Sequence, residues 1–149
     1  MSNELCKILI MCGGKGSRMG NLTSEIPKPL IEINGKAVLE HKINNYLNQG
    51  FKSLEIAVGY KKNKIEDLVS SLNNKLRSKI KFSYAGENAG ILNRLHFAAK
   101  EKTSRIIVTY GDTIANVDLK QLLKSHNESN NKATIVVASI TNPFGLVEF

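Results

Sequence analysis

The sequence has few cysteines and no long apolar segment, and each shortage excludes a class of protein. Only Cys6 and Cys12 occur among the 149 residues. They are too few for a disulfide framework, and their spacing matches no metal-binding pattern. No apolar run is long enough to span a bilayer or to form a signal peptide. We therefore expect a cytoplasmic protein with reduced, structural cysteines and no membrane partner.

Aromatic residues are also scarce, at 6% of the chain, although the formal net charge is +8. Such a charge suits nucleic acid, an anionic membrane or a phosphorylated ligand, so the distribution of Lys and Arg decides between them. The basic residues are scattered. The densest cluster, at 61–64, is followed at once by acidic residues, as on a solvated helix face. Aromatic and basic residues are not interleaved as in single-strand binders, so we expect no nucleic-acid partner.

Strand-like and helix-like patterns alternate along the chain without internal repeats or low-complexity segments. Apolar runs predict strands at 8–11, 54–58, 80–84, 106–110 and 133–140. Amphipathic patterns predict helices at 38–47, at 65–76, after Gly90, and after Asp118 as an N-cap. The helix after Gly90 is expected to carry these residues inward: Ile91, Leu92, Leu95, Ala98 and Ala99.

Apolar strands separated by amphipathic helices indicate one doubly wound α/β domain over 1–149 with a mostly parallel sheet. Ligands of such sheets bind at the carboxyl ends of the strands. The functional loops should therefore follow Met11, Val58, Tyr84 and Tyr110. Residues 144–149, FGLVEF, alternate like another strand in which the chain stops, so the predicted sheet looks cut short.

The loop 13–19 reads GGKGSRM and directly follows the first predicted strand. Its three glycines indicate a sharp bend or the close approach of a ligand. The segment does not match a Walker loop, because Gly16 follows the lysine. It does not match the dinucleotide fingerprint either, because Met19 stands where the third glycine of that motif should be. What remains is a nest of backbone N–H groups with Ser17 and Arg18, which suits anionic oxygens. A tight strand-to-helix turn is the alternative.

Two further residues are expected near this loop. Lys28 lies between Pro27 and Pro29, whose restrained backbone suits the placing of a point charge near a phosphate, although a surface turn would tolerate it too. Asp112 follows Gly111 at the end of a predicted strand, where a carboxylate could hold Mg²⁺. The alternative for Asp112 is a helix cap or a turn residue.

Five segments, GGKGSRM, PKPLIEINGKAVLEH, VGYKKNKIEDL, AGILNRLHFA and TYGDTIANVDL, resemble the successive motifs of the sugar-1-phosphate nucleotidyltransferases. The resemblance covers essentially the whole chain. It implies Mg²⁺-dependent transfer of a nucleotidyl group from an NTP to a sugar 1-phosphate, which releases pyrophosphate. The product would be a nucleotide sugar for surface polysaccharide.

The resemblance also implies roles for individual residues. Arg18 would assist the departure of pyrophosphate, Lys28 would contact phosphate, and Asp112 would bind Mg²⁺. The residues implied in nucleotide binding are Met11, Cys12, Gly13, Gly14, Gly16, Ser17, Asn88, Gly90 and Gly111. The family's second metal-binding aspartate and most residues that hold the sugar phosphate would lie beyond Phe149.

The motifs leave the base and the assembly open. TYGDTIANVDL and FGLVEF most resemble glucose-1-phosphate cytidylyltransferases and favour CTP, whereas MCGGKGSRM is closer to some guanylyltransferases. Residues 86–90 depart from the family's Leu-Gly-Thr-Ala-Gly. Two alternatives stand beside the enzyme: a non-catalytic nucleotide-binding or regulatory subunit, and a guanylyltransferase of the molybdopterin or cobinamide type. A homo-oligomer is a further open alternative.

Overall fold

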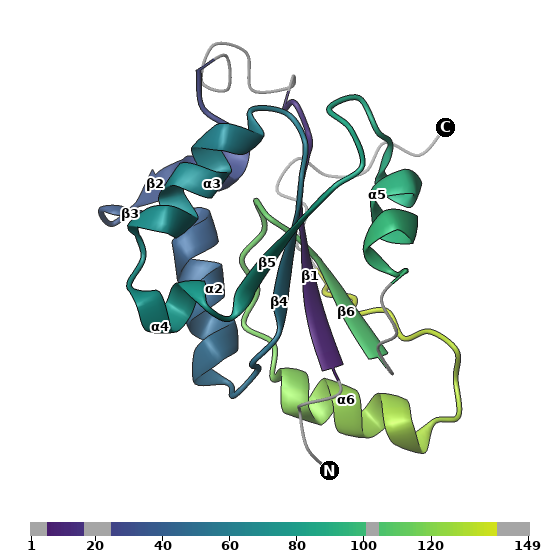
Figure 1. The fold of residues 1–149 in the computed structure, drawn as a ribbon. Coiled ribbons are helices and arrows are strands. Elements are labelled where there is room, and N and C mark those ends of the chain that lie inside the picture. Colours follow the sequence, from purple (N-terminus) through teal and green to yellow (C-terminus); the bar gives the residue numbers. More distant parts are fainter. Residues whose placement is uncertain (1–5, 17–24, 101–104, 140–149) are drawn as a thin grey trace, which may run out of the picture. The chain divides into compact units, whose positions relative to one another are not determined.

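The computed structural model describes residues 6–16, 25–100 and 105–139 (Figure 1). Internal contacts divide the chain into one unit that ends at Asn116 and a second that begins at Val117. The predictions made for Ser17, Arg18 and residues 144–149 lie outside the described residues.

The first unit is built on a sheet of four parallel strands. They are β1 (Cys6–Cys12), β4 (Leu54–Val58), β5 (Ile80–Tyr84) and β6 (Arg105–Tyr110). Their order is β5-β4-β1-β6, so β1 has a parallel partner on each side, with Ile8 opposite both Leu54 and Ile107. Four of the five predicted strands and the parallel sheet are confirmed.

Helices cover both faces of this sheet. The connections contain the 3-10 helix η3 (Lys28–Leu30), the short antiparallel strands β2 (Glu32–Ile33) and β3 (Lys36–Ala37), and the helices α2 (Val38–Asn48), α3 (Lys62–Ser71), α4 (Asn74–Arg77) and α5 (Ile91–Ala98). Helices α2 and α3 lie on one side and α5 on the other (Figure 1). Right-handed crossovers explain this arrangement, because the chain steps from β1 to β4 to β5 in one direction and returns to β6 in the other. The doubly wound prediction is confirmed.

Strand β1 is buried along its whole length because it has neighbours on both edges and helices over both faces. Its side chains alternate between the two faces. The cluster that includes α5 consists of Leu9, Met11, Ala57 and Ala98. On the α2 side, Lys42 and Tyr46 donate hydrogen bonds of 3.1 Å to the hydroxyl of Thr109 on β6. The sheet is thus fixed by apolar packing on one face and partly by polar contacts on the other.

One helix is predicted over 65–76, but the structure has two. The chain leaves the helical conformation at Leu72, whose ψ is 155°. Asn73 then starts α4, because its side chain accepts a hydrogen bond of 3.0 Å from the Leu76 amide. Asparagine competes with a continuing helix by bonding nearby backbone groups in this way. The apolar periodicity runs through the break and therefore did not reveal it.

The predicted inward face of α5 is wrong in part. Ile91, Leu92 and Ala99 are exposed, whereas Ala98 is buried and Leu95 packs partly against the core. The helix instead turns Arg94 inward, with 5% of its surface exposed. A prediction of the buried face from apolar periodicity assumes that charged residues face water. That assumption does not hold here, because a guanidinium whose donors are hydrogen-bonded can be buried.

Residues 133–140 are predicted as a strand, and the described part of this segment, 133–139, forms none. Ile135 and Val137 are 83% and 86% exposed. The β-branched residues give the segment a high strand propensity, but a strand also needs a neighbour for its N–H and C=O groups. Within the described ranges, no strand pairs with this segment.

In the second unit, helix α6 (Leu119–Glu128) begins as the sequence predicts. The side chain of Asp118 accepts hydrogen bonds from the amides of Lys120 and Gln121 at 2.9 and 3.0 Å. This N-cap satisfies amides that lack a partner in the first turn. None of the helices in the described part of the chain is long and apolar enough to cross a bilayer.

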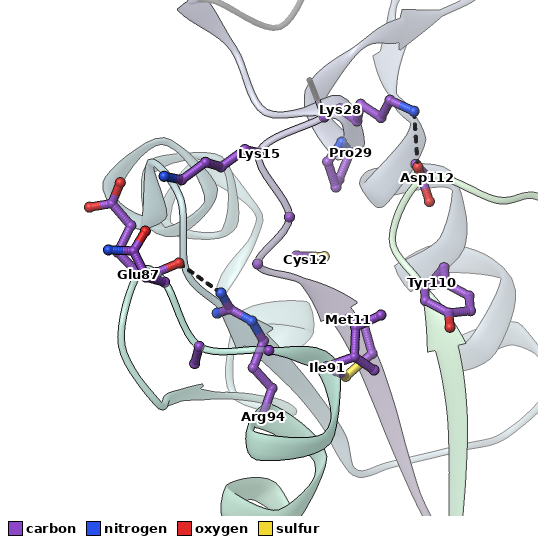
Figure 2. Close-up of a pocket in the computed structure, with 16 residues that line it drawn as sticks. Met11, Cys12, Lys15, Lys28, Pro29, Glu87, Ile91, Arg94, Tyr110 and Asp112 are labelled. Atoms are coloured by element: carbon purple, nitrogen blue, oxygen red, sulfur yellow. Dashed lines mark hydrogen bonds and ion pairs between the residues drawn. The ribbon is translucent and has the colours of Figure 1, made fainter. Parts of the chain in front are cut away.

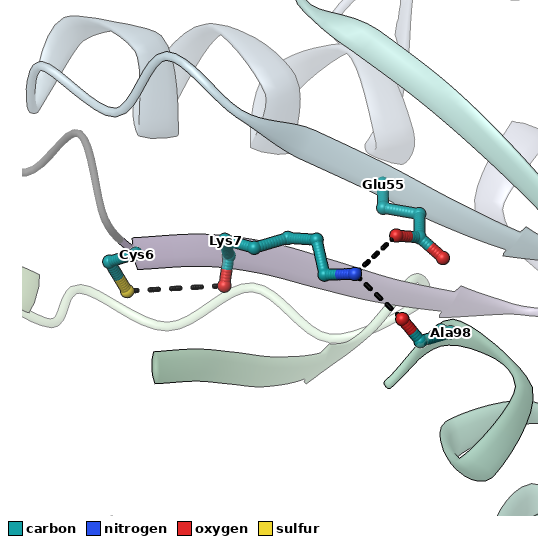
Figure 3. Close-up of polar contacts among 4 residues, drawn as sticks. All are labelled: Cys6, Lys7, Glu55 and Ala98. Carbon is teal, nitrogen blue, oxygen red and sulfur yellow. Dashed lines mark hydrogen bonds and ion pairs between the residues drawn. The ribbon is translucent and has the colours of Figure 1, made fainter. Parts of the chain in front are cut away.

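A buried ion pair joins β1, β4 and the end of α5 (Figure 3). Lys7 Nζ lies 2.6 Å from Glu55 Oε2 and donates a second hydrogen bond of 2.7 Å to the Ala98 carbonyl. The two charged side chains are only 2% and 6% exposed. Removing one partner of such a pair leaves a buried charge without compensation, which costs more than removing both.

We predict that Lys7→Met lowers the free energy of unfolding by about 3 kcal/mol, because Glu55 then keeps a buried, unpaired charge. The double variant Lys7→Met/Glu55→Leu should recover most of this loss. Urea unfolding of the wild type, the single variant and the double variant measures both effects. Equal losses in the two variants would contradict the prediction.

Candidate functional site

A cleft of about 420 Å³ lies at the carboxyl ends of β1, β5 and β6 (Figure 2). The residues that line it are Met11, Cys12, Gly13, Gly14, Lys15, Gly16, Lys28, Pro29, Glu87, Asn88, Ala89, Gly90, Ile91, Arg94, Tyr110 and Asp112. The chain reverses its direction across the sheet between β1 and β6, and ligands of such folds bind at this switch point. Of the loops predicted to be functional, those after Met11, Tyr84 and Tyr110 line the cleft.

The glycine loop forms one wall. The carbonyl of Gly13, the first residue of the loop, accepts a hydrogen bond of 3.3 Å from the Tyr60 amide. This bond ties the loop to the segment after β4. Gly16 has a φ of +67°, a conformation that favours glycine. Nothing lies within 4 Å of a Cβ placed on Gly14, so the backbone is open to the cleft there. Ser17 and Arg18, predicted to belong to this loop, lie outside the described residues.

Lys28 and Asp112 meet beside the glycine loop, on the side of Tyr110 (Figure 2). Lys28 begins η3 between Pro27 and the buried Pro29, and its Nζ lies 3.6 Å from Asp112 Oδ2. Their side chains are 22% and 40% exposed. A pair this open to water contributes at most about 1 kcal/mol, so an anionic ligand can replace the carboxylate at small cost.

Asp112 is positioned by the main chain around it. The Gly111 amide donates a hydrogen bond of 2.9 Å to the Met11 carbonyl, which brings the end of β6 beside the end of β1. On the far side, buried Lys42 donates a short hydrogen bond to the Thr113 carbonyl. Asp112 lies in a turn and Asp118 caps α6, so the helix-cap alternative for Asp112 is excluded.

Gly111 packs too closely for any side chain. A Cβ there would lie 2.5 Å from Cys12 Sγ, 2.9 Å from Pro29 Cγ and 3.2 Å from the Met11 carbonyl oxygen. The predicted site residues Met11, Cys12 and Gly111 are therefore brought together with the Pro-Lys-Pro element. Gly111 itself packs behind the wall and is not among the residues that line the cleft.

Cys12 forms part of the cleft floor as a neutral thiol. Burial raises its pKa to about 12; Lys42 lowers that pKa and Asp112 raises it by smaller amounts. A thiol with this pKa is protonated at neutral pH, and the thiolate is the nucleophilic form. Cys12 is therefore an apolar surface in this cleft and no nucleophile.

Residues 86–90 form the opposite wall and lead into α5. Gly86 has a φ of +108°, and its carbonyl accepts a hydrogen bond of 3.3 Å from the Ala89 amide. Gly90 then caps α5. Both predicted residues of this wall, Asn88 and Gly90, line the cleft.

Arg94 is a residue of the cleft that the sequence patterns did not reveal. Its guanidinium donates hydrogen bonds of 2.8 Å to the carbonyls of Val58 and Glu87. Burial lowers its pKa, and Tyr84 raises that pKa by a smaller amount. The available signal was Gly13 together with Gly59, since glycines after two adjacent strands can indicate a bulky group packed between them.

Three cationic side chains and two carboxylates line the cleft: Lys15, Lys28, Arg94, Glu87 and Asp112. Among the described residues, no group of three or more His, Cys, Asp or Glu side chains could hold a metal ion. A lone carboxylate nevertheless fits Mg²⁺, which keeps several waters and often binds through one or two carboxylates plus substrate phosphates. Asp112, partly exposed beside Lys28, fits that description.

Comparisons with known proteins relate the chain to one family. Residues 7–149 match the family model described as Nucleotidyl transferase. The chain is 31% identical to a probable glucose-1-phosphate cytidylyltransferase of Bacillus subtilis and 30% identical to a mannose-1-phosphate guanylyltransferase catalytic subunit beta of Danio rerio. The alignments cover 93% and 96% of this chain but only 63% and 41% of those proteins. The chain thus spans part of the length of its curated relatives.

Solved structures show the same relationship. HddC from Yersinia pseudotuberculosis in complex with GMP-PN superimposes with a TM-score of 0.68 at 32% identity, over 80% of this chain and 53% of that one. A UDP-glucose pyrophosphorylase in complex with UDP-glucose gives 0.65 at 19% identity, over 83% and 53%, and shows likeness of fold alone.

We predict that Gly111→Ala destabilises the protein by about 1–3 kcal/mol, because the new methyl group overlaps Cys12 and Pro29. Gly14→Ala is the matched control. Gly14 has open space at its Cβ position and is not among the glycines with a positive φ, so its substitution should change stability by less than about 0.5 kcal/mol. Urea unfolding compares them, and equal stability of the two variants would refute the close packing.

Proposed function

Because the chain belongs to the nucleotidyl transferase family, we propose that it provides the nucleotide-binding part of a sugar-1-phosphate nucleotidyltransferase. The observation that carries the proposal is the meeting of Lys28 and Asp112 beside the glycine loop, in one cleft at the switch point of the sheet. This arrangement offers backbone amides, a cation and a carboxylate to a single triphosphate.

The proposed reaction makes few demands on acid–base groups. An oxygen of the sugar 1-phosphate attacks the α-phosphorus of the NTP. The bond between the α-phosphorus and the oxygen that bridges to the β-phosphate breaks, and pyrophosphate leaves with the electron pair of that bond. A phosphate monoester with a second pKa of about 6 is already largely ionised at neutral pH, so no general base is needed. The protein's tasks are to align two anions and to stabilise the charge that develops on pyrophosphate.

The residues of the cleft divide these tasks. The amides of the glycine loop would hold the triphosphate, and Lys28 would exchange its weak pair with Asp112 for a phosphate oxygen. Asp112 would hold Mg²⁺, which when bound neutralises charge on the phosphates. Arg18, from the resemblance, would assist the departure of pyrophosphate. An NTP substrate makes the cytoplasm the proposed compartment.

For the base we propose CTP, supported by the cytidylyltransferase-like TYGDTIANVDL and by the Bacillus subtilis relative. GTP is the second candidate. The observation that favours it is the likeness to HddC, which was solved in complex with GMP-PN. Residues 87–90 would contact the base, since they form the wall opposite the glycine loop.

We expect the chain to bind an NTP in the presence of Mg²⁺, with CTP bound more tightly than GTP, UTP or dTTP. Lys28→Met should weaken this binding by about tenfold, because a charge-assisted hydrogen bond to phosphate is lost. Lys64→Met, which removes an exposed lysine on α3, is the matched control and should bind as the wild type does. Isothermal titration calorimetry with the four nucleotides measures these affinities.

Turnover separates the enzyme from a non-catalytic subunit. With a panel of sugar 1-phosphates, a protein that joins this chain to a sugar-phosphate-binding part should release pyrophosphate, and Arg18→Ala should abolish the release. Nucleotide binding without pyrophosphate would favour the alternative of a regulatory or nucleotide-binding subunit. Failure to bind any of the four nucleotides would refute both the enzyme and the non-catalytic subunit. If GTP binds more tightly than CTP, GTP replaces CTP as the proposed substrate.

A further inference from the structure

Arg94 occupies an unusual place beneath the cleft. It lies in the first turns of α5, and its side chain runs back toward the ends of β1 and β4 (Figure 2). Only 5% of its surface is exposed, yet it still contributes to the lining of the cleft. A buried guanidinium is costly unless its donors are satisfied, so its surroundings indicate what it does.

The guanidinium is bonded to main chain. Nη1 donates to the Val58 carbonyl at the end of β4, and Nη2 donates to the Glu87 carbonyl in the opposite wall, both at 2.8 Å. Carbonyl oxygens fix the position of a segment, whereas a carboxylate partner would mainly neutralise charge. The rigid fork of arginine can make both bonds at once, which the single ammonium of lysine does less well.

Two glycines leave room for this group. A Cβ on Gly13 would lie 2.2 Å from Arg94 Nη1, and a Cβ on Gly59 would lie 2.1 Å from the same atom. Neither residue is among the glycines with a positive φ, so alanine could adopt either backbone conformation. These two positions therefore need glycine for space. The guanidinium lies against the glycine loop, the end of β4 and residue 87 together.

We propose that Arg94 is a positioning residue that sets the spacing between the glycine loop and residues 87–90, and thereby the cleft's selectivity among nucleoside triphosphates. The inference rests on the proposed function, because the two walls would hold the phosphates and the base of one nucleotide. An error in their spacing misplaces the base relative to its wall while the phosphates stay bound. Loss of Arg94 should therefore reduce discrimination between bases in addition to affinity.

The test uses the full chain and the four nucleotides CTP, GTP, UTP and dTTP. Arg94→Lys keeps the charge and removes the fork, so the ratio of affinities between the preferred and the other nucleotides should fall by about fivefold or more. Arg94→Ala should lower the ratio further. Arg77→Ala removes an exposed arginine of α4 and is the matched control. A general loss of stability would lower all four affinities together and leave the ratio unchanged.

Gly59→Ala tests the mechanism from outside the cleft, because Gly59 is not among its lining residues. The added methyl group should displace the guanidinium and lower the affinity ratio by about fivefold in the wild-type background. In the Arg94→Ala background the same substitution should have little effect. Equal effects of Gly59→Ala in the two backgrounds would overturn the inference.

The outcomes separate the two claims. If the wild-type chain binds none of the four nucleotides, the proposed function is wrong and the selectivity role falls with it. If the wild type binds and discriminates but Arg94→Lys and Arg94→Ala keep the wild-type ratio, only the role of Arg94 is refuted. Should Arg94→Ala fail to fold, Arg94→Lys and Gly59→Ala alone decide, and an unchanged ratio in both would refute the role.

Discussion

The pairing of β1 with a parallel strand on each side is the constraint on which the cleft depends. Parallel pairing brings the carboxyl ends of β4, β1 and β6 to one edge of the sheet, so loops distant in sequence meet there. The change of crossover direction after β5 then leaves a space between the ends of β1 and β6. The glycine loop enters this space directly from β1, and Asp112 enters it from β6.

Close packing then turns this edge into a specific site. At Gly111 the absence of a side chain lets the end of β6 rest on Cys12 and Pro29. At Gly13 and Gly59 it admits a guanidinium between two strands. None of these three glycines has a positive φ, in contrast to Gly16 and Gly86. Glycine thus serves two purposes here: it allows a positive φ at some positions and close packing at others. The glycines near the strand ends, Gly13, Gly59 and Gly111, serve packing.

The sequence predicted the parallel sheet, its four strands and the convergence of Lys28, Asp112 and the glycine loop, because these depend on local pattern and on a general rule of α/β topology. It did not predict Arg94, since hydrophobic periodicity counts charged residues as exposed. It missed the break at Asn73, where a side-chain hydrogen bond overrides propensity. The strand expected at 133–140 needed a neighbouring strand, which no local pattern supplies.

Buried cations connect these observations. In the described part of the chain, three basic side chains are buried, and each donates to a backbone carbonyl next to a loop or helix end: Lys7 to Ala98, Lys42 to Thr113 and Arg94 to Glu87. Apolar packing is non-directional and holds the sheet and helices together, but it does not fix where a loop carbonyl points. A charge-assisted hydrogen bond does fix it. The chain therefore accepts the desolvation cost of these cations where two of its elements must keep a set distance. Of the three, Arg94 lines the cleft, and Lys42 holds the residue that follows Asp112.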